Sequence, residues 1–174
     1  MIKFKIKRNE CRKLIEVIRA ISNRNKGDFK TLIKLINGMN DLIDANKEYI
    51  DRFAKIMEAR QTLIDVGTRK VSEYRGKLLE SIENGEKVDA EKKKEFDSFQ
   101  QMVVAQVNDE LGNEIVPRIR QLDSELGSEE IEVELGDDKT KYIMEALESH
   151  GCEHESSELI TKLYTILSSG QKEV

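Results

Sequence analysis

Apolar and basic residues alternate at every step of the opening stretch IKFKIK, residues 2–7. This period of two predicts a β-strand with isoleucine and phenylalanine on one face and lysine on the other. Residues 130–135, EIEVEL, repeat the pattern with glutamate in place of lysine. Facing lysines and glutamates attract one another, so we expect the two segments to pair as a two-stranded β-ribbon. The pattern does not decide whether the strands run parallel or antiparallel.

A helical period governs most of the remaining chain. Apolar residues recur three or four apart over about residues 9–22, which predicts a first helix. They then recur every seven residues from Phe29 to Leu78, which predicts one long helix over about 28–84.

A third helix is predicted over about residues 89–126, where apolar residues again lie three or four apart. Because a short polar connection separates it from the long helix, the two are expected to form an antiparallel hairpin. Proline cannot donate a backbone hydrogen bond, so Pro117 predicts a kink or short break between residues 112 and 117. Two short helices follow, over about 137–149 and 156–169.

The fold class is therefore mainly α: a long antiparallel helical hairpin, with the β-ribbon and the short helices packed at its base. The apolar stripe of the long helix is broad up to residue 63 and narrow after it. A broad stripe is typical of a helix with several neighbours, and a narrow one of a two-helix coiled-coil seam. We predict a single domain, residues 1–174, with a base formed by residues 1–64 and 111–174. A hairpin arm, about residues 65–110, would project from this base.

Composition narrows the class of protein. The 174 residues are 38% apolar and 36% charged, with one proline and no tryptophan, which fits long helices with wide solvated faces. No apolar run approaches the ~20 residues that span a bilayer, and no signal-peptide pattern opens the chain. Cys11 and Cys152 make no disulfide framework. We expect a cytoplasmic protein that does not enter the membrane.

The net charge of −5 is unevenly distributed along the chain. Basic residues prevail in residues 1–26, which makes nucleic-acid binding by this basic face an alternative function. Acidic residues prevail in residues 123–174, a pattern that would also suit a mimic of nucleic acid. The β-ribbon gives a simpler account, because it brings the two oppositely charged ends together.

The only two histidines of the chain lie beside a cysteine in the stretch HGCEH. In an extended segment His150, Cys152 and His154 would point to one side, and zinc favours such nitrogen and sulfur ligands. The spacing matches no familiar zinc pattern, and Gly151 suits a turn between two helices. A small zinc-stabilised module is therefore the alternative to a linker turn, and no other cofactor is expected.

The outer part of the hairpin offers a surface for a partner. Residues 65–110 hold a narrow apolar seam and many charges, and no other predicted element is long enough to cover them. The candidate interaction residues combine basic side chains with aromatic ones near the seam: Arg69, Lys70, Tyr74, Lys77, Lys92, Lys93 and Phe96. The same half-covered seam would also allow homo-oligomerisation.

Sequence motifs of the common enzyme chemistries are not found. The chain contains none of the motifs that mark phosphate, dinucleotide, acyl-transfer or zinc-protease sites. We therefore expect a non-enzymatic protein that binds another protein, or acts as an adaptor, through the hairpin arm or the acidic base.

Three features together resemble the small, uncharacterised accessory proteins of phages and prophages of low-GC bacteria. These are the MIKFKIK strand that runs into a helix, the charged central helices, and the closing stretch IEVELGDDKTKYIMEALES. The resemblance implies a cytoplasmic accessory or inhibitor protein that acts by binding a host or viral protein. It carries no functional residue over to this chain.

Overall fold

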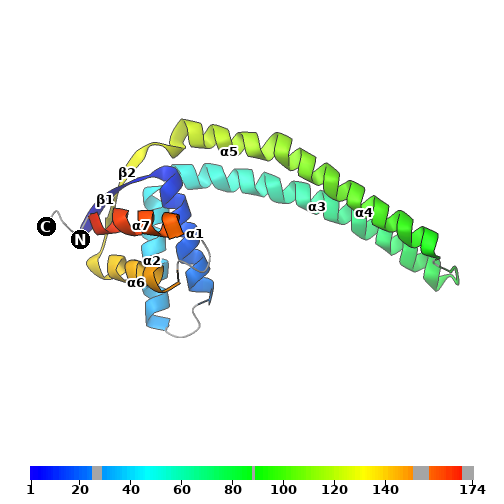
Figure 1. Ribbon diagram of the computed structural model, residues 1–174, viewed down its shortest axis with the longest axis horizontal. Coiled ribbons are helices and arrows are strands. Elements are labelled where there is room, and N and C mark those ends of the chain that lie inside the picture. The colour runs from blue at the N-terminus through cyan, green and yellow to red at the C-terminus, as the bar shows by residue number, and fades with distance from the viewer. Residues whose placement is uncertain (25–28, 88, 151–156, 170–174) are drawn as a thin grey trace. The chain divides into compact units, whose positions relative to one another are not determined.

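A computed structural model describes residues 1–24, 29–87, 89–150 and 157–169 of the chain (Figure 1). The chain divides into two compact units. Unit 1 comprises Met1–Arg52 and Leu122–Val174, and unit 2 comprises Phe53–Gln121. Both ends of the chain therefore contribute to unit 1.

The predicted β-ribbon is present in unit 1. Strands β1 (Ile2–Lys7) and β2 (Glu130–Leu135) pair antiparallel, which settles the direction that the pattern left open. Their register places each lysine opposite a glutamate: Lys3 opposite Glu134, Lys5 opposite Glu132 and Lys7 opposite Glu130. Lys3 forms ion pairs with Glu134 and, at 3.9 Å, with Glu132. Since these side chains are exposed, their ion pairs add little to the stability of the β-ribbon, and their main effect is to select the partner strand.

The inner face of the β-ribbon forms part of the unit 1 core. Helices α1 (Arg8–Arg24), α6 (Asp137–His150) and α7 (Ser157–Ser169) supply most of the remaining core residues. The buried apolar side chains are Ile2, Phe4, Ile6, Val133 and Leu135 of the strands, Cys11, Leu14, Ile15, Val17, Ile18 and Ile21 of α1, Ile143, Ala146 and Leu147 of α6, and Ile160, Leu163 and Leu167 of α7, together with Leu35 and Leu42. The predicted amphipathic segments thus bury their apolar faces together, at about 1.5–3 kcal/mol for each large side chain.

The prediction of one long helix over 28–84 is wrong, because the structure has two helices, α2 (Phe29–Ala45) and α3 (Lys47–Glu83). Asn46 separates them and is fully buried. Its side-chain Nδ2 donates to the backbone carbonyl of Arg8 at 2.8 Å, and its Oδ1 accepts from the Arg8 guanidinium at 3.4 Å. The backbone keeps helical bonds across this point, from the Asn46 N–H to the Leu42 carbonyl and from the Ile50 N–H to the Asn46 carbonyl. The buried Asn46 side chain thus ties the junction of α2 and α3 to the start of α1.

Helix α6 packs against α2, as the broad apolar stripe of this segment predicts. Gly38 of α2 lies close to α6, since a Cβ atom built at Gly38 would stand 2.9 Å from Cδ1 of Ile143. Helix α7 packs against α6 and β1.

Unit 2 contains the helical hairpin. It holds most of α3, all of α4 (Ala90–Glu110), the π-helical segment η1 (Leu111–Ile115) and most of α5 (Val116–Leu122). Figure 1 shows α3 and α4 side by side. Gly67 of α3 lies against Val107 of α4, whereas Tyr74, later in α3, lies against Phe99, earlier in α4. The two helices therefore run antiparallel, and the predicted hairpin is confirmed.

The predicted irregularity between residues 112 and 117 is confirmed in position. In η1 the backbone N–H of Val116 bonds to the carbonyl of Leu111, five residues earlier, which makes a turn wider than that of an α-helix. Pro117 lacks an N–H, and its ring would crowd the carbonyl one turn earlier. The wider turn accommodates this ring without ending the helix.

Among the helices of the described part of the chain, none combines the length with the apolar composition that a bilayer crossing requires.

Candidate functional site

The hairpin seam has its closest approach at Gly67 of α3. A Cβ atom built at Gly67 would lie 2.5 Å from Cγ2 of Val107 and 3.5 Å from Cγ1 of Val103, both on α4. Real Cβ atoms do not come within 3.0 Å of another heavy atom, so glycine permits this spacing of the helices. Val103 is buried in the seam, and Val107 is half-buried.

Aromatic packing holds the seam together farther along the hairpin. The ring of Tyr74 stacks on that of Phe99, with centroids 4.7 Å apart, and contacts that of Phe96 at 5.7 Å. These rings prefer such offset contacts, which add about 0.5–1.5 kcal/mol to the burial of their surfaces.

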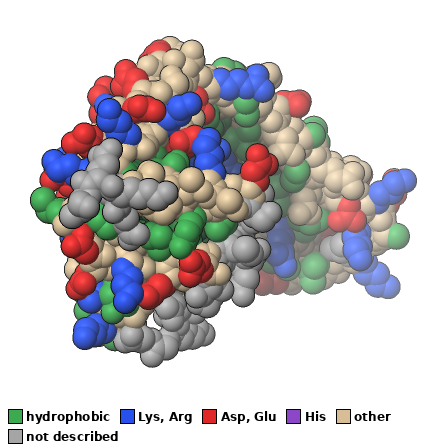
Figure 2. Space-filling view, turned by 60° about the vertical axis from the view of Figure 1, so that its left-hand side comes forward, with side chains coloured by type: hydrophobic (Ala, Val, Ile, Leu, Met, Phe, Trp, Pro, Cys, Tyr) green, Lys and Arg blue, Asp and Glu red, His purple; other side chains and the backbone are tan. Residues whose placement is uncertain are grey.

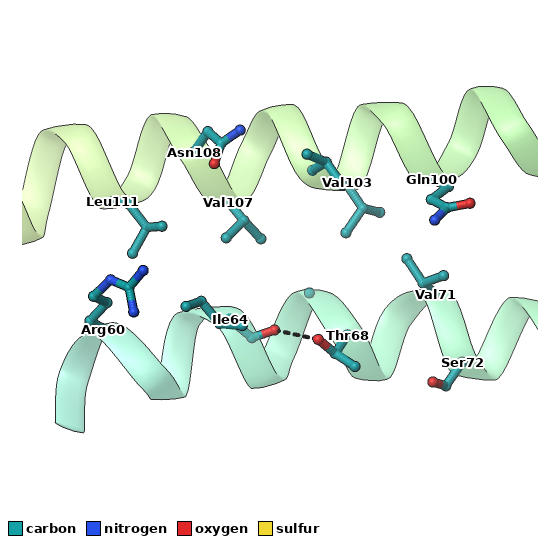
Figure 3. A pocket seen from close by; sticks show the side chains of 12 residues that line it. Arg60, Ile64, Thr68, Val71, Ser72, Gln100, Val103, Val107, Asn108 and Leu111 are labelled. Atoms are coloured by element: carbon teal, nitrogen blue, oxygen red, sulfur yellow. Dashed lines mark hydrogen bonds between the residues drawn. The ribbon is translucent and has the colours of Figure 1, made fainter. Parts of the chain in front are cut away.

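From the aromatic contact to the start of η1, a groove of about 450 Å³ opens along one side of the seam, with Gly67 in its lining (Figure 3). Figure 3 shows Ile64 and Val71 of α3 directed toward Val103, Val107 and Leu111 across the seam. The full lining is Arg60, Ile64, Gly67, Thr68, Val71, Ser72, Gln100, Val103, Val104, Val107, Asn108 and Leu111. The groove is thus apolar along its floor, with short polar side chains at its edges.

Two apolar side chains of α4 are about half exposed. Val104 is 52% exposed and lines the groove, whereas Met102 is 49% exposed and does not. Because they are alike in exposure and two residues apart, they allow the groove to be tested separately from general surface hydrophobicity.

A shallow depression on α4 continues the groove. It is lined by Asp97, Gln100, Gln101, Val104, Ala105 and Asn108, of which Gln100, Val104 and Asn108 also line the groove. Arg60 is the charged residue of the groove lining, and Asp97 is that of the depression. We call the two together the hairpin groove.

The seven predicted interaction residues all lie in unit 2 but do not line the hairpin groove. Tyr74 and Phe96 are brought together in the seam, where both are half-buried. Lys92 is half-buried and pairs with Glu86 at 3.0 Å, which raises the pKa of Lys92 and lowers that of Glu86. The remaining basic residues, Arg69, Lys70, Lys77 and Lys93, are exposed. Sequence reasoning missed the groove itself, although Gly67 at a seam position was a signal of close helix packing.

The predicted metal ligands fall outside the described residues, since Cys152 and His154 and the side chain of His150 are not among them. Elsewhere in the described ranges, no three His, Cys, Asp or Glu side chains come close enough together to hold a metal ion.

The basic N-terminal segment is engaged in ion pairs within unit 1. Arg8 pairs with Glu129 at 3.1 Å and with Glu48 at 3.7 Å, and Arg12 pairs with Glu16 at 2.5 Å. Figure 2 shows acidic and basic side chains interspersed over the face it presents. The visible charges of this face are therefore mixed in sign and do not form one continuous basic surface.

A second polar cluster of unit 1 surrounds Tyr49, a fully buried residue of α3. Its hydroxyl donates a hydrogen bond to Asp123, which lies in the π-helical segment η2 (Asp123–Gly127). Burial, followed by this hydrogen bond, raises the pKa of Tyr49 to about 12. Burial likewise raises the pKa of the Cys11 thiol to about 12, so this cysteine is a poor nucleophile at neutral pH.

We expect the free energy of unfolding to fall as the pH rises from 10 to 12. The raised pKa means that the folded state favours the neutral phenol of Tyr49, whose contribution is complete below its ordinary pKa of 10 and lost near 12. Denaturant titrations at several pH values would measure this fall, and Tyr49→Phe should show a shallower one. Ionisation of Cys11 lowers the free energy of unfolding of both proteins as the pH rises from 9 to 12. Parallel pH profiles for the two proteins would contradict the assignment.

Comparison with protein-family models, curated proteins and solved structures found no match to this chain. The hairpin groove must therefore be interpreted from its own geometry.

Proposed function

We propose that this protein binds another protein through the hairpin groove and acts without catalysis, as an adaptor or accessory protein. The observation that carries the proposal is the apolar groove of about 450 Å³ between α3 and α4, with Val104 half exposed in its lining. Solvent-exposed apolar grooves of this kind are typical of interaction sites.

A helix is the partner element that fits the groove best. The groove runs along two antiparallel helices, and a helix laid into it would complete a bundle by ridges-into-grooves packing. Such a helix would present apolar residues three or four apart to Ile64, Val71 and Val104, while its polar face stayed in water. Asn108 offers a side-chain donor and acceptor at the edge of the groove, whereas the Thr68 hydroxyl donates to the Ile64 carbonyl at 2.9 Å and can only accept from a partner.

The finer part of the proposal concerns the setting. We place the protein in the cytoplasm, and its resemblance to phage and prophage accessory proteins favours a host or viral protein as the partner. The charged surface of unit 1 is a second contact region within this proposal, because acidic and basic side chains are both exposed there.

A photo-cross-linking amino acid placed at position 104 tests the groove as a binding surface. In cells that produce the protein, benzoylphenylalanine at position 104 is expected to give a covalent adduct with a protein chain. The same group at position 102 is the matched control, since Met102 is equally exposed but lies outside the groove. Adducts of equal yield at both positions, or none at position 104, would contradict the proposal.

A further inference from the structure

We propose that the occupant of the hairpin groove is a second copy of this chain, lying antiparallel across it. In this arrangement Arg60 of each copy pairs with Asp97 of the other. The inference rests on the proposed function, since it names the protein that fills the same groove.

Charge is distributed unevenly along the hairpin groove. Arg60 and Asp97 are the charged side chains of its lining, and they lie toward opposite ends. Arg60 lies by Leu111 in Figure 3, and Leu111 is fourteen residues from Asp97 along the chain. At about 1.5 Å per residue, this separation is roughly 20 Å. Within the described residues, neither side chain forms an ion pair.

Two-fold symmetry relates the two copies of the groove. In a two-fold dimer each copy offers the same surface, so residue i of one copy meets residue j of the other and the reverse. An antiparallel pairing brings the Arg60 end of one copy to the Asp97 end of the other, twice. A parallel pairing would place Arg60 near its own equivalent, with like charges together. The charges therefore select the antiparallel arrangement.

The surface between the two charged ends is largely apolar and uncharged. Val104 lies in both parts of the groove and, near its centre, would meet the apolar floor of the other copy. Gln100 and Asn108 flank it and carry donors and acceptors without a net charge. An apolar centre with a polar rim is the usual layout of a protein interface.

The size of the groove sets the expected affinity. A strip roughly 20 Å long and two helices wide covers on the order of 400 Å² on each copy. Stable interfaces bury about 800 Å² per partner. We therefore expect a reversible dimer with a dissociation constant in the micromolar range or weaker.

Sedimentation velocity of the purified full chain, from about 5 μM to about 1 mM, tests the inference. The wild-type chain is expected to shift from monomer to dimer over this range. Arg60→Asp and Asp97→Arg should each weaken the dimer roughly tenfold, because each places like charges at both ends. An equimolar mixture of the two variants should form a heterodimer as tight as the wild-type dimer, since opposite charges meet again. A misfolded variant could not give this recovery.

Two controls complete the experiment. Val104→Glu should abolish dimerisation, whereas Met102→Glu should leave it within about twofold of wild type. A chain that stays monomeric at 1 mM, or a mixture no tighter than the single variants, would overturn the second-copy proposal. If position 104 still cross-links to a different protein in cells, the proposed function stands without it. If the chain dimerises in solution but position 104 gives no adduct in cells, the proposed function fails alone.

Discussion

Replacing Phe4 with alanine is expected to lower the free energy of unfolding by about 3–5 kcal/mol. Phe4 is 4% exposed and belongs to the core under the β-ribbon. Its removal takes away apolar burial and leaves a cavity that the strands and α1 can close only in part. Denaturant unfolding followed by far-UV circular dichroism and by tyrosine fluorescence would measure the loss.

Lys5→Ala is the matched control for this prediction. Lys5 is the next residue of β1, lies on its exposed face, and stands opposite Glu132. Its replacement should change the free energy of unfolding by no more than about 0.5 kcal/mol. Equal losses for Phe4→Ala and Lys5→Ala would mean that the strand does not have one buried and one exposed face.

Replacing Gly67 with valine is expected to destabilise the hairpin by about 1–3 kcal/mol. The new side chain would overlap Val107, whose branched side chain has little freedom to move aside. Helix α3 and helix α4 would have to separate, and the floor of the hairpin groove would change shape. The same unfolding measurement reports the loss, and Val107→Ala in the same chain should recover part of it.

Gly76→Val separates this packing effect from helix propensity. Gly76 lies in the same helix, and nothing stands within 4 Å of a Cβ atom built there. Valine has a higher helix propensity than glycine, so this variant should be neutral or slightly more stable than wild type. If Gly67→Val is equally harmless, the close approach of the two helices is not as described.

The sequence predicts the β-ribbon well because each strand has its own alternating pattern and the two patterns match in length. Alternation in IKFKIK and EIEVEL fixes which face is buried, and the opposite charges identify the partner. The short helices and the hairpin follow from apolar spacing in the same way. Such elements depend on periodicity, which a single sequence displays directly.

The interruption at Asn46 could not be predicted in this way. Asn46 is one polar residue in an otherwise continuous helical pattern, without glycine or proline beside it. What holds it is the hydrogen bond to the carbonyl of Arg8, a residue far away in the sequence. No window along the chain contains such a tertiary contact, so periodicity alone does not reveal it.

The hairpin groove lies between these two cases. A narrow seam over residues 65–110 is visible in the sequence, and it indicates a partly covered surface. The width of the groove, however, depends on Gly67 fitting against Val107, and the position of its charges depends on which faces of α3 and α4 meet. The predicted interaction residues follow from residue type and position in the sequence, whereas the groove is formed by side-chain packing between α3 and α4.

The distance along the chain between the two strands has a consequence for synthesis. At roughly 5–20 residues per second, β1 leaves the ribosome on the order of ten seconds before β2 exists. During that interval its backbone edge is unpaired and open to other nascent chains. Lys3, Lys5 and Lys7 lie within β1 on its exposed face, and lysines in an edge strand discourage such pairing. The three lysines are thus expected to act as gatekeepers against aggregation until the glutamates of β2 emerge.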